Sequence, residues 1–133
     1  MATHFPFVTL GIYGTELKPE IVTSKLAMTP SSCHQKGDTS VSQTGKKWIA
    51  KTGAWLLYSS DLCDSPKLED HLKIITNVIP KTDLTKIAGA EEAKIVICVS
   101  LSQQPEIVRL SASMLKQLIP YNAVLTIEAY EED

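Results

Sequence analysis

Hydrophobic and polar residues alternate at the start of the chain. In the segment FPFVTLGIYG, residues 5–14, Val8, Leu10 and Ile12 fall on one face of an extended chain. Phe7, Thr9 and Tyr13 fall on the other face. Because side chains of a strand point alternately to its two faces, the pattern predicts a strand.

Three later segments also have the character of strands. The segments AWLLYSS, residues 54–60, and AKIVICVSL, residues 93–101, carry bulky residues on both faces, which is typical of central strands. The third segment is AVLTIEAY, residues 123–130, which alternates: Leu125, Ile127 and Ala129 point one way, and Thr126 and Glu128 the other. One face of this last strand is therefore expected to meet solvent.

The segments between these strands favour helices. Pro19, with Lys18 at the cap position, predicts a helix over 19–27. A second helix begins near Pro66, capped by Asp64 or Ser65, and ends at Pro80; its apolar stripe is Leu68, Leu72, Ile75 and Ile79. Residues 82–93 predict a further helical turn or two that breaks at Gly89. Ser111 predicts the cap of a last helix with the apolar residues Met114, Leu115, Leu118 and Ile119.

Residues 29–47, TPSSCHQKGDTSVSQTGKK, are polar and rich in turn formers. We expect a long loop there, with at most a weak edge strand, and loops of this length are usually functional or mobile. The order of elements predicts an α+β fold. Residues 1–133 are expected to form a single domain, with a twisted, mostly antiparallel or mixed sheet of four to five strands packed against two to three helices.

Composition narrows the function classes. The chain has 133 residues, 44% of them hydrophobic and 21% charged, which is ordinary for one globular domain. Its longest apolar run, residues 95–99, is far too short to span a bilayer. The first 14 residues show no secretion signal, and three cysteines without short spacing suit reduced thiols, so we expect a cytoplasmic protein. A net charge of −2 makes nucleic-acid binding unlikely on whole-molecule electrostatics.

No motif indicates catalysis. Phosphate loops, dinucleotide fingerprints and nucleophile elbows are absent from the sequence. His71 flanks the apolar stripe of its helix and is expected to be partly buried and hydrogen-bonded to backbone. The residues that could in principle bind zinc lack the paired spacing of structural zinc sites, and no metal or cofactor is predicted; these residues are Cys33, His34, Asp38, Cys63, Asp64 and His71. A Cys–His nucleophilic pair, for example with Cys33 or His34, stays open because its members need only meet in space.

Both tryptophans lie in WIAKTGAWLLYSS, residues 48–60. Trp55 begins a run of bulky residues and is interpreted as a core anchor, whereas Trp48 is the tryptophan expected at the surface. Three lysines, Lys46, Lys47 and Lys51, surround Trp48 and leave open a basic aromatic patch for single-stranded nucleic acid. Against that patch, a strand displays only alternate residues on one face.

The carboxyl end collects acidic residues around Tyr130, namely Glu128, Glu131, Glu132 and Asp133. Such a cluster is usually a solvated tail. The alternative is an acidic docking surface for a basic partner, for example a nuclease, because complementary charge speeds encounter and disfavours wrong partners.

Several segments together resemble the bacterial family called domain of unknown function four-two-seven-nine. They are the first strand ending in glycine, the KGD of residues 36–38, the GAW of residues 53–55 and the LEDHL of residues 68–72. Lys18, where the family tends to have an acidic residue, and extra polar residues between 38 and 48 depart from the pattern. The resemblance implies a bacterial source, a single α+β domain and no cofactor, and it suggests an immunity role that some relatives serve.

The sequence therefore predicts a noncatalytic protein-binding module, most concretely an immunity protein that binds and blocks a cognate bacterial toxin, for example a nuclease. The predicted contacts form two groups. Glu128, Glu131 and Glu132 form the first, and Trp48 with the loop of residues 29–47, including Lys36 and Asp38, forms the second. The alternative is a small-molecule or single-stranded nucleic-acid binding or regulatory domain. The sequence does not determine the oligomeric state of the chain.

Overall fold

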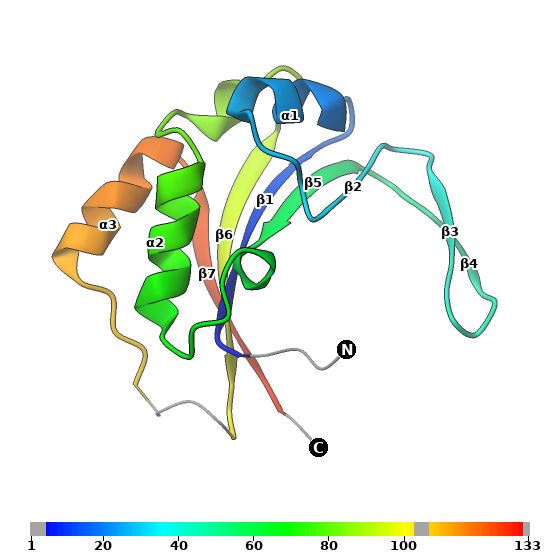
Figure 1. Ribbon diagram of the computed structural model, residues 1–133. Coiled ribbons are helices and arrows are strands. Elements are labelled where there is room, and N and C mark those ends of the chain that lie inside the picture. The colour runs from blue at the N-terminus through cyan, green and yellow to red at the C-terminus, as the bar shows by residue number, and fades with distance from the viewer. Residues whose placement is uncertain (1–4, 103–106, 132–133) are drawn as a thin grey trace.

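A five-stranded mixed sheet forms the centre of the protein (Figure 1). The structure, a computed structural model, describes residues 5–102 and 107–131. The strands of the sheet lie in the order β2-β5-β1-β6-β7, and only β6 and β7 run parallel. Their bounds are β1, Phe7–Gly14; β2, Ser32–His34; β5, Gly53–Tyr58; β6, Glu92–Ser100; and β7, Val124–Tyr130. The predicted α+β fold, with a mixed sheet of up to five strands and up to three helices, is confirmed.

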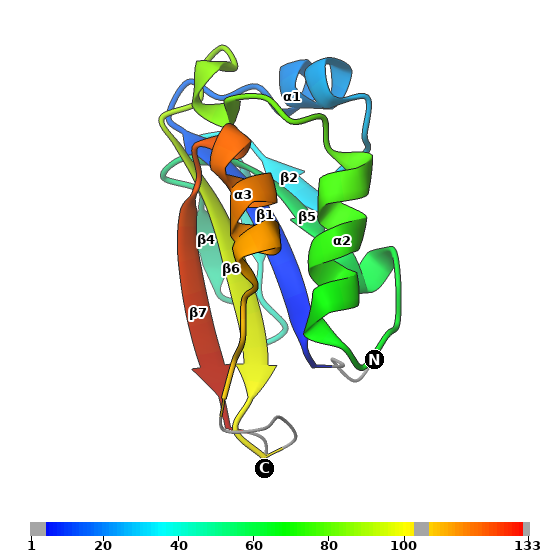
Figure 2. The same ribbon diagram turned by 90° about the vertical axis from the view of Figure 1, so that its left-hand side faces the viewer.

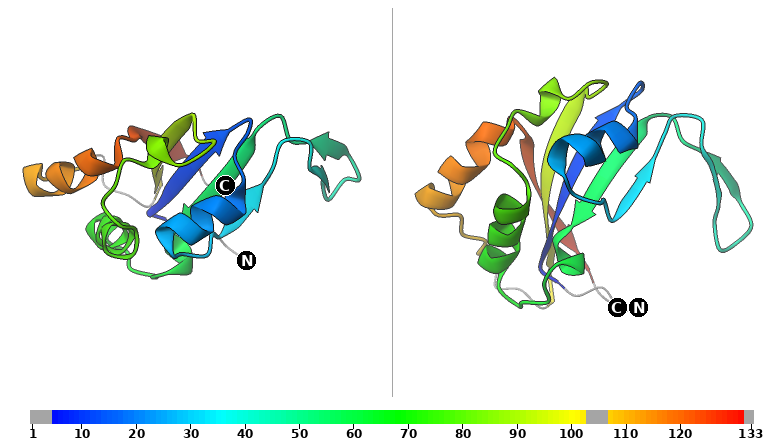
Figure 3. Two further views of the ribbon diagram at one scale, coloured as in Figure 1. Left: turned by 90° about the horizontal axis from the view of Figure 1, so that it is seen from above. Right: turned by 45° about the horizontal axis from the view of Figure 1, so that its top comes forward.

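All three α-helices of the described chain lie on one side of this sheet (Figures 2 and 3). They are α1, Pro19–Leu26; α2, Leu68–Val78; and α3, Ala112–Leu118. Between the helices and the sheet lies one hydrophobic core, which includes Leu10, Leu57, Ile95 and Ile97. No helix within residues 5–102 and 107–131 covers the opposite face of the sheet, so its side chains are available for contact.

The alternation of the first strand is confirmed. Val8, Leu10 and Ile12 are fully buried beneath the helices, whereas Phe7 and Tyr13 lie on the open face and are only half-buried. Trp55 is the core anchor that the sequence predicts: it is fully buried. Its indole N–H donates to Thr23 Oγ1 at 3.1 Å, which ties α1 to the sheet.

The helix starts agree with the sequence in two of three cases. Lys18 holds the cap position of α1, and Ser111 Oγ accepts from the Met114 N–H at 3.1 Å to cap α3. For α2 the predicted cap is wrong, because the helix begins at Leu68 and Lys67 occupies the cap position.

Ser65 explains the late start of α2. Its hydroxyl oxygen accepts from the Lys67 N–H at 3.0 Å, and its O–H donates to Asp70 at 2.6 Å. This local turn takes the bonds that a cap would form, so the helix starts after it. The helical turn predicted near residue 84 is a short 3₁₀ helix, Leu84–Lys86, and the chain turns at Gly89 with φ of 86°.

The segment 29–47 contains more structure than the expected loop. It holds β2 and most of a hairpin that projects away from the body of the protein (Figure 1). The hairpin pairs β3, Thr39–Val41, with β4, Lys47–Ile49. These strands have three residues each and no buried face, so they lack the alternation by which a strand is found in a sequence.

The last strand also differs from the prediction. Side chains on both faces of β7 are exposed, including Ile127 at 50%. The apolar stripe of α3 is likewise only half covered, with Met114 and Leu118 buried but Ile119 72% exposed. An edge strand has a neighbour on one side only, and nothing in the described chain packs over the outer part of β7 and α3.

Gly53, the glycine of the GAW segment, lies where the backbone is crowded. A Cβ at this position would lie 2.9 Å from the carbonyl oxygens of both Gly14 and Leu17. The first strand and the turn before α1 therefore require glycine here.

The longest helix, α2, has 11 residues. Within residues 5–102 and 107–131, no helix combines the length and apolar content needed to cross a membrane.

Candidate functional site

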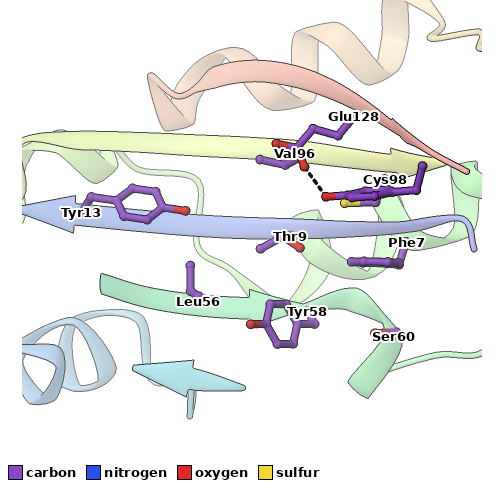
Figure 4. Close-up of a pocket in the computed structure, with 10 residues that line it drawn as sticks. Phe7, Thr9, Tyr13, Leu56, Tyr58, Ser60, Val96, Cys98 and Glu128 are labelled. Carbon is purple, nitrogen blue, oxygen red and sulfur yellow. Dashed lines mark hydrogen bonds between the residues drawn. The ribbon is translucent and has the colours of Figure 1, made fainter. Parts of the chain in front are cut away.

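A hollow of about 460 Å³ lies on the open face of the sheet (Figure 4). Four strands and the turn after β5 contribute to it, and we call it the sheet hollow. Its lining residues are Phe7, Thr9 and Tyr13 from β1, Leu56 and Tyr58 from β5, Ser60, Val96 and Cys98 from β6, and Glu128 and Tyr130 from β7.

Strand register brings these residues together. Thr9 is directly opposite Tyr58 on one side and Val96 on the other. Cys98 is opposite Glu128 in the parallel pair. Residues that are opposite each other across strands project to the same face, so two neighbouring rows of side chains cross the sheet. Tyr58, Thr9 and Val96 form one row, and Phe7, Cys98 and Glu128 form the other.

The sheet hollow is rich in aromatic rings. Phe7, Tyr13, Tyr58 and Tyr130 come from three strands that are not neighbours in sequence. The faces of such rings carry partial negative charge and attract cations such as ammonium and guanidinium groups. The Lys94 ammonium of this protein already lies 5.7 Å from the centre of the Tyr13 ring.

Glu128 supplies the carboxylate of the sheet hollow, and the Tyr130 O–H donates a hydrogen bond to it (Figure 4). This bond, with a contribution from burial, raises the pKa of Tyr130 to about 12. Burial, followed by the charge of Glu128, raises the pKa of the Cys98 thiol to about 11. The phenol and the thiol beside Glu128 therefore stay neutral at pH 7, and the carboxylate lies among rings and neutral groups that suit a positively charged partner.

The β3–β4 hairpin presents a second exposed surface. Trp48 is 50% exposed, and Val41 and Ile49 are also exposed. The His34 ring meets Trp48 edge to face, with ring centres 5.6 Å apart. Because Lys47 and Trp48 are adjacent in a strand, they project to opposite sides, and they do not form one basic stacking platform.

Lys36 and Asp38 lie at the base of the hairpin. The Asp38 carboxylate accepts from the Gln35 N–H at 2.8 Å, and backbone bonds join Gly37 and Asp38 to Ala50 at 2.8 Å each. Asp38 therefore has a structural role in the turn, and Gly37 has a φ of 92°, which favours glycine. Lys36 is exposed and free to contact a partner.

The predicted contact residues fall into two separate groups. Glu128 lines the sheet hollow, and Glu131 follows β7 directly and is exposed. Glu132 lies outside the described residues. Trp48, Lys36 and Asp38 lie near β2, at the opposite edge of the sheet from β7.

The sequence interpretation did not identify the aromatic residues of the sheet hollow. Their signal was present in β1, where Phe7, Thr9 and Tyr13 share the face opposite the core. The residues that β5 and β6 contribute to the hollow could not be recognised in the sequence, because both strands carry bulky side chains on both faces.

His71 is part of a buried hydrogen-bond network. It is 2% exposed, and its Nε2 lies 2.7 Å from the carbonyl oxygen of Ser65, which requires a proton on Nε2. Its Nδ1 lies 2.7 Å from the Ser59 hydroxyl oxygen, and the Cys63 Sγ lies 3.6 Å from the same nitrogen. The predicted bond to backbone is confirmed, although the ring is buried more deeply than expected.

This network faces the core instead of solvent. Ser59 is fully buried, and its hydroxyl oxygen also accepts from the Val8 N–H at 2.7 Å. The arrangement joins α2 to β1 and to the turn after β5. In the described part of the chain, no three His, Cys, Asp or Glu side chains gather as a metal site requires, and the three thiols are free.

A comparison with protein families finds one match that covers nearly the whole chain. The family model with the description Domain of unknown function (DUF4279) matches residues 2–132. No significant match is found among curated proteins or among solved structures.

Proposed function

The chain belongs to the DUF4279 family, and from the geometry of its open sheet face we propose that it is a noncatalytic protein-binding module. More specifically, it acts as an immunity protein in the bacterial cytoplasm, where it binds and blocks a cognate toxin. The observation that carries this proposal is the sheet hollow, a surface that no helix of the described chain covers and that four aromatic rings and one carboxylate line.

The composition of the sheet hollow supports a protein partner. Aromatic residues dominate the energetic centres of protein interfaces, because they bury a large rigid area at a small entropic cost. Tyr58 and Tyr13 lie on central strands whose backbone is fixed on both sides. A surface held in this way is preformed, so little conformational freedom is lost on binding.

The charge of the sheet hollow supports a basic partner. Glu128 is flanked by groups that stay neutral at pH 7, and an arginine or lysine side chain of the partner would meet both its carboxylate and the neighbouring Tyr130 ring. Toxins that act on nucleic acids need basic residues to hold phosphates. A carboxylate at this position can occupy the groups that the phosphate would contact.

The β3–β4 hairpin supplies a second contact. It extends from the edge of the sheet opposite β7, and its exposed Trp48 and Ile49 are apolar groups that a partner can cover. Together the two surfaces allow the protein to contact its partner at two points.

The proposal of a noncatalytic role rests on the position of the nucleophilic groups. Ser59 and His71 are hydrogen-bonded to each other inside the core, where a substrate cannot reach them. Cys98 lines the sheet hollow, but its raised pKa keeps it in the thiol form, which is a poor nucleophile.

The test is coexpression with the product of the adjacent upstream gene. We expect that product to arrest growth alone, to be tolerated when the chain is present, and to copurify with it. A harmless product that leaves the chain unbound would refute the immunity role.

Variants then locate the binding surface. Glu128→Gln and Tyr58→Ala should each weaken binding at least about tenfold. Glu69→Gln is the matched control, because Glu69 is also exposed to solvent but lies on α2, on the covered side of the sheet. Equal affinities for all three variants, with unchanged melting temperatures, would show that the partner binds elsewhere.

A second candidate function is the binding of a small organic cation. The volume of the sheet hollow, about 460 Å³, falls in the range of about 300 to 1,000 Å³ that is typical of ligand sites. Choline titrated by NMR should then shift the resonances of Tyr58 and Tyr130 and saturate below about 1 mM, whereas absent or unsaturated shifts would dismiss it. Nucleic acid would instead require the hairpin lysines, and unchanged oligonucleotide binding in Lys46→Ala, Lys47→Ala and Lys51→Ala would dismiss that role.

A further inference from the structure

The outer edge of β7 carries backbone groups without partners in the described chain. The Tyr130 carbonyl accepts from the Leu101 N–H at 2.9 Å, so Tyr130 directs its backbone groups toward β6. Backbone direction alternates along a strand, and the register of β6 and β7 is continuous over all seven residues. The N–H and C=O groups of Leu125, Ile127 and Ala129 therefore point outward, and no hydrogen bond joins them to any residue in 5–102 or 107–131.

This edge lacks the usual protection against pairing. Natural edge strands are commonly short, or interrupted by proline, lysine or a bulge. The opposite edge follows this rule, because β2 has three residues. By contrast β7 has seven residues, VLTIEAY, with one charge, no proline and no lysine.

The helix side of β7 is apolar at the same place. Leu125, Leu115, Leu118 and Ile119 line a groove of about 420 Å³ between β7 and α3. Ile127, also on this side of the strand, is 50% exposed. A partner that extends the sheet would cover these groups as well as the free backbone.

We propose that β7 pairs with β7 of a second copy of this chain, antiparallel across a twofold axis at Ile127. In this register Ile127 is opposite its own counterpart, and Leu125 is opposite Ala129 of the other copy. All three outward residues then form hydrogen-bonded pairs, with roughly six bonds in all, two for each of three pairs. The two sheets become one continuous sheet, and the apolar side chains of Ile127 meet on the axis.

The position of the Glu128 carboxylate favours this register and a second copy of the chain as the partner. With the axis at Ile127, Glu128 is opposite Thr126 of the other copy, whose hydroxyl can donate to the carboxylate. Moving the axis by one residue to Glu128 places the two carboxylates directly opposite each other, which is destabilising. Moving it to Leu125, Thr126 or Ala129 leaves part of the strand beyond the end of its partner. The strand is therefore complementary to itself in one register.

The first test is the mass of the native protein, measured by sedimentation at about 50 μM. We expect a dimer for the wild type and a monomer for Ile127→Lys, which places two like charges at the axis. Ile127→Pro removes only the outward N–H and should also give a monomer, and the melting temperature of each variant reports whether it folds. The matched control is Ile49→Lys on the hairpin, which should stay dimeric.

The second test is the register. Paired cysteines at position 127 would lie about 5.5 Å apart at Cα, a distance that a disulfide can span. In a Cys33→Ser background, which removes the exposed thiol, Ile127→Cys should form a crosslinked dimer on oxidation. Leu125→Cys should not, because its two copies lie roughly 14 Å apart along the strands at about 3.4 Å per residue. A monomeric wild type, or a dimer that Ile127→Lys leaves intact and that crosslinks equally at both positions, would overturn the proposal.

Discussion

Replacing Cys98 with alanine tests whether the folded protein disfavours the negatively charged thiolate of Cys98 in the sheet hollow. The Cys98 side chain is buried between Phe7 on β1 and Glu128 on β7, its direct neighbours in the sheet register. Burial, followed by the charge of Glu128, raises its pKa from 9.0 to about 11. The thiolate is thus disfavoured in the folded protein and free to form in the unfolded chain.

The size and sign of the effect follow from proton linkage. Below about pH 9 both states hold the proton, and the stability is fully present. Between about pH 9 and 11 the unfolded chain releases the proton while the folded protein keeps it, so the free energy of unfolding falls as the pH rises. At about 1.4 kcal/mol for each pH unit, the loss reaches roughly 2 kcal/mol at about pH 10.5.

Urea unfolding of the wild type and Cys98→Ala, with reductant, at about pH 8 and 10.5 checks this value. The difference in unfolding free energy between the two proteins should move in favour of the variant by roughly 2 kcal/mol. The tyrosine residues are present in both proteins, so their titration largely cancels. Glu128→Gln should lose less stability over this range than the wild type, because it removes the second cause of the Cys98 shift and the hydrogen bond that raises the pKa of Tyr130. A difference that is constant within about 0.5 kcal/mol would refute the inference that burial and Glu128 disfavour the Cys98 thiolate in the folded protein.

Three further substitutions test the core. Trp55→Phe removes the indole N–H bonded to Thr23 and part of a buried ring. It should lower the unfolding free energy by about 1–3 kcal/mol in urea titrations, and an unchanged value would refute the role of Trp55 as anchor. Tyr121→Phe leaves the Ile79 carbonyl without the hydroxyl that donates to it at 2.7 Å, and a loss of about 1–2 kcal/mol is expected, with a neutral result contradicting the bond. His71→Ala leaves a buried cavity and breaks two hydrogen bonds. The unfolding free energy, measured by thermal or urea unfolding, should fall by about 2–4 kcal/mol. A smaller loss than that of Tyr121→Phe would argue against the network.

Much of the fold could be predicted from the pattern of residues that are close in the sequence. The alternation of β1, the run of β-branched residues in β6 and the stripe of α2 each report burial of one element against a core. The cap at Ser111 was also readable, because its bond to Met114 spans three residues. The start of α2 was misplaced because Ser65 can form either a cap or a turn, and the choice depends on its neighbours in space.

The sheet hollow could not be predicted as a site. Its residues come from β1, β5, β6 and β7, and the first and last of them are more than a hundred positions apart in the sequence. Each is an ordinary strand residue by itself. Glu128 was identified through the acidic carboxyl end around Tyr130, but Cys98 and Tyr58 joined these residues only through strand register. The hairpin was missed for a different reason: it has no buried face and hence no pattern.

The sequence by itself determined which segments become the four longer strands and the helices, which face of each is apolar, and that Trp55 belongs to the core, because these properties depend on neighbours within a few residues. The tertiary structure decided that all three helices cover the same face of the sheet, that β6 and β7 run parallel, and that β7 has a free edge. These features arise from pairing between distant strands, where many arrangements satisfy the same local pattern. The open face and the free edge, on which the proposed function and the proposed dimer depend, belong to this second group.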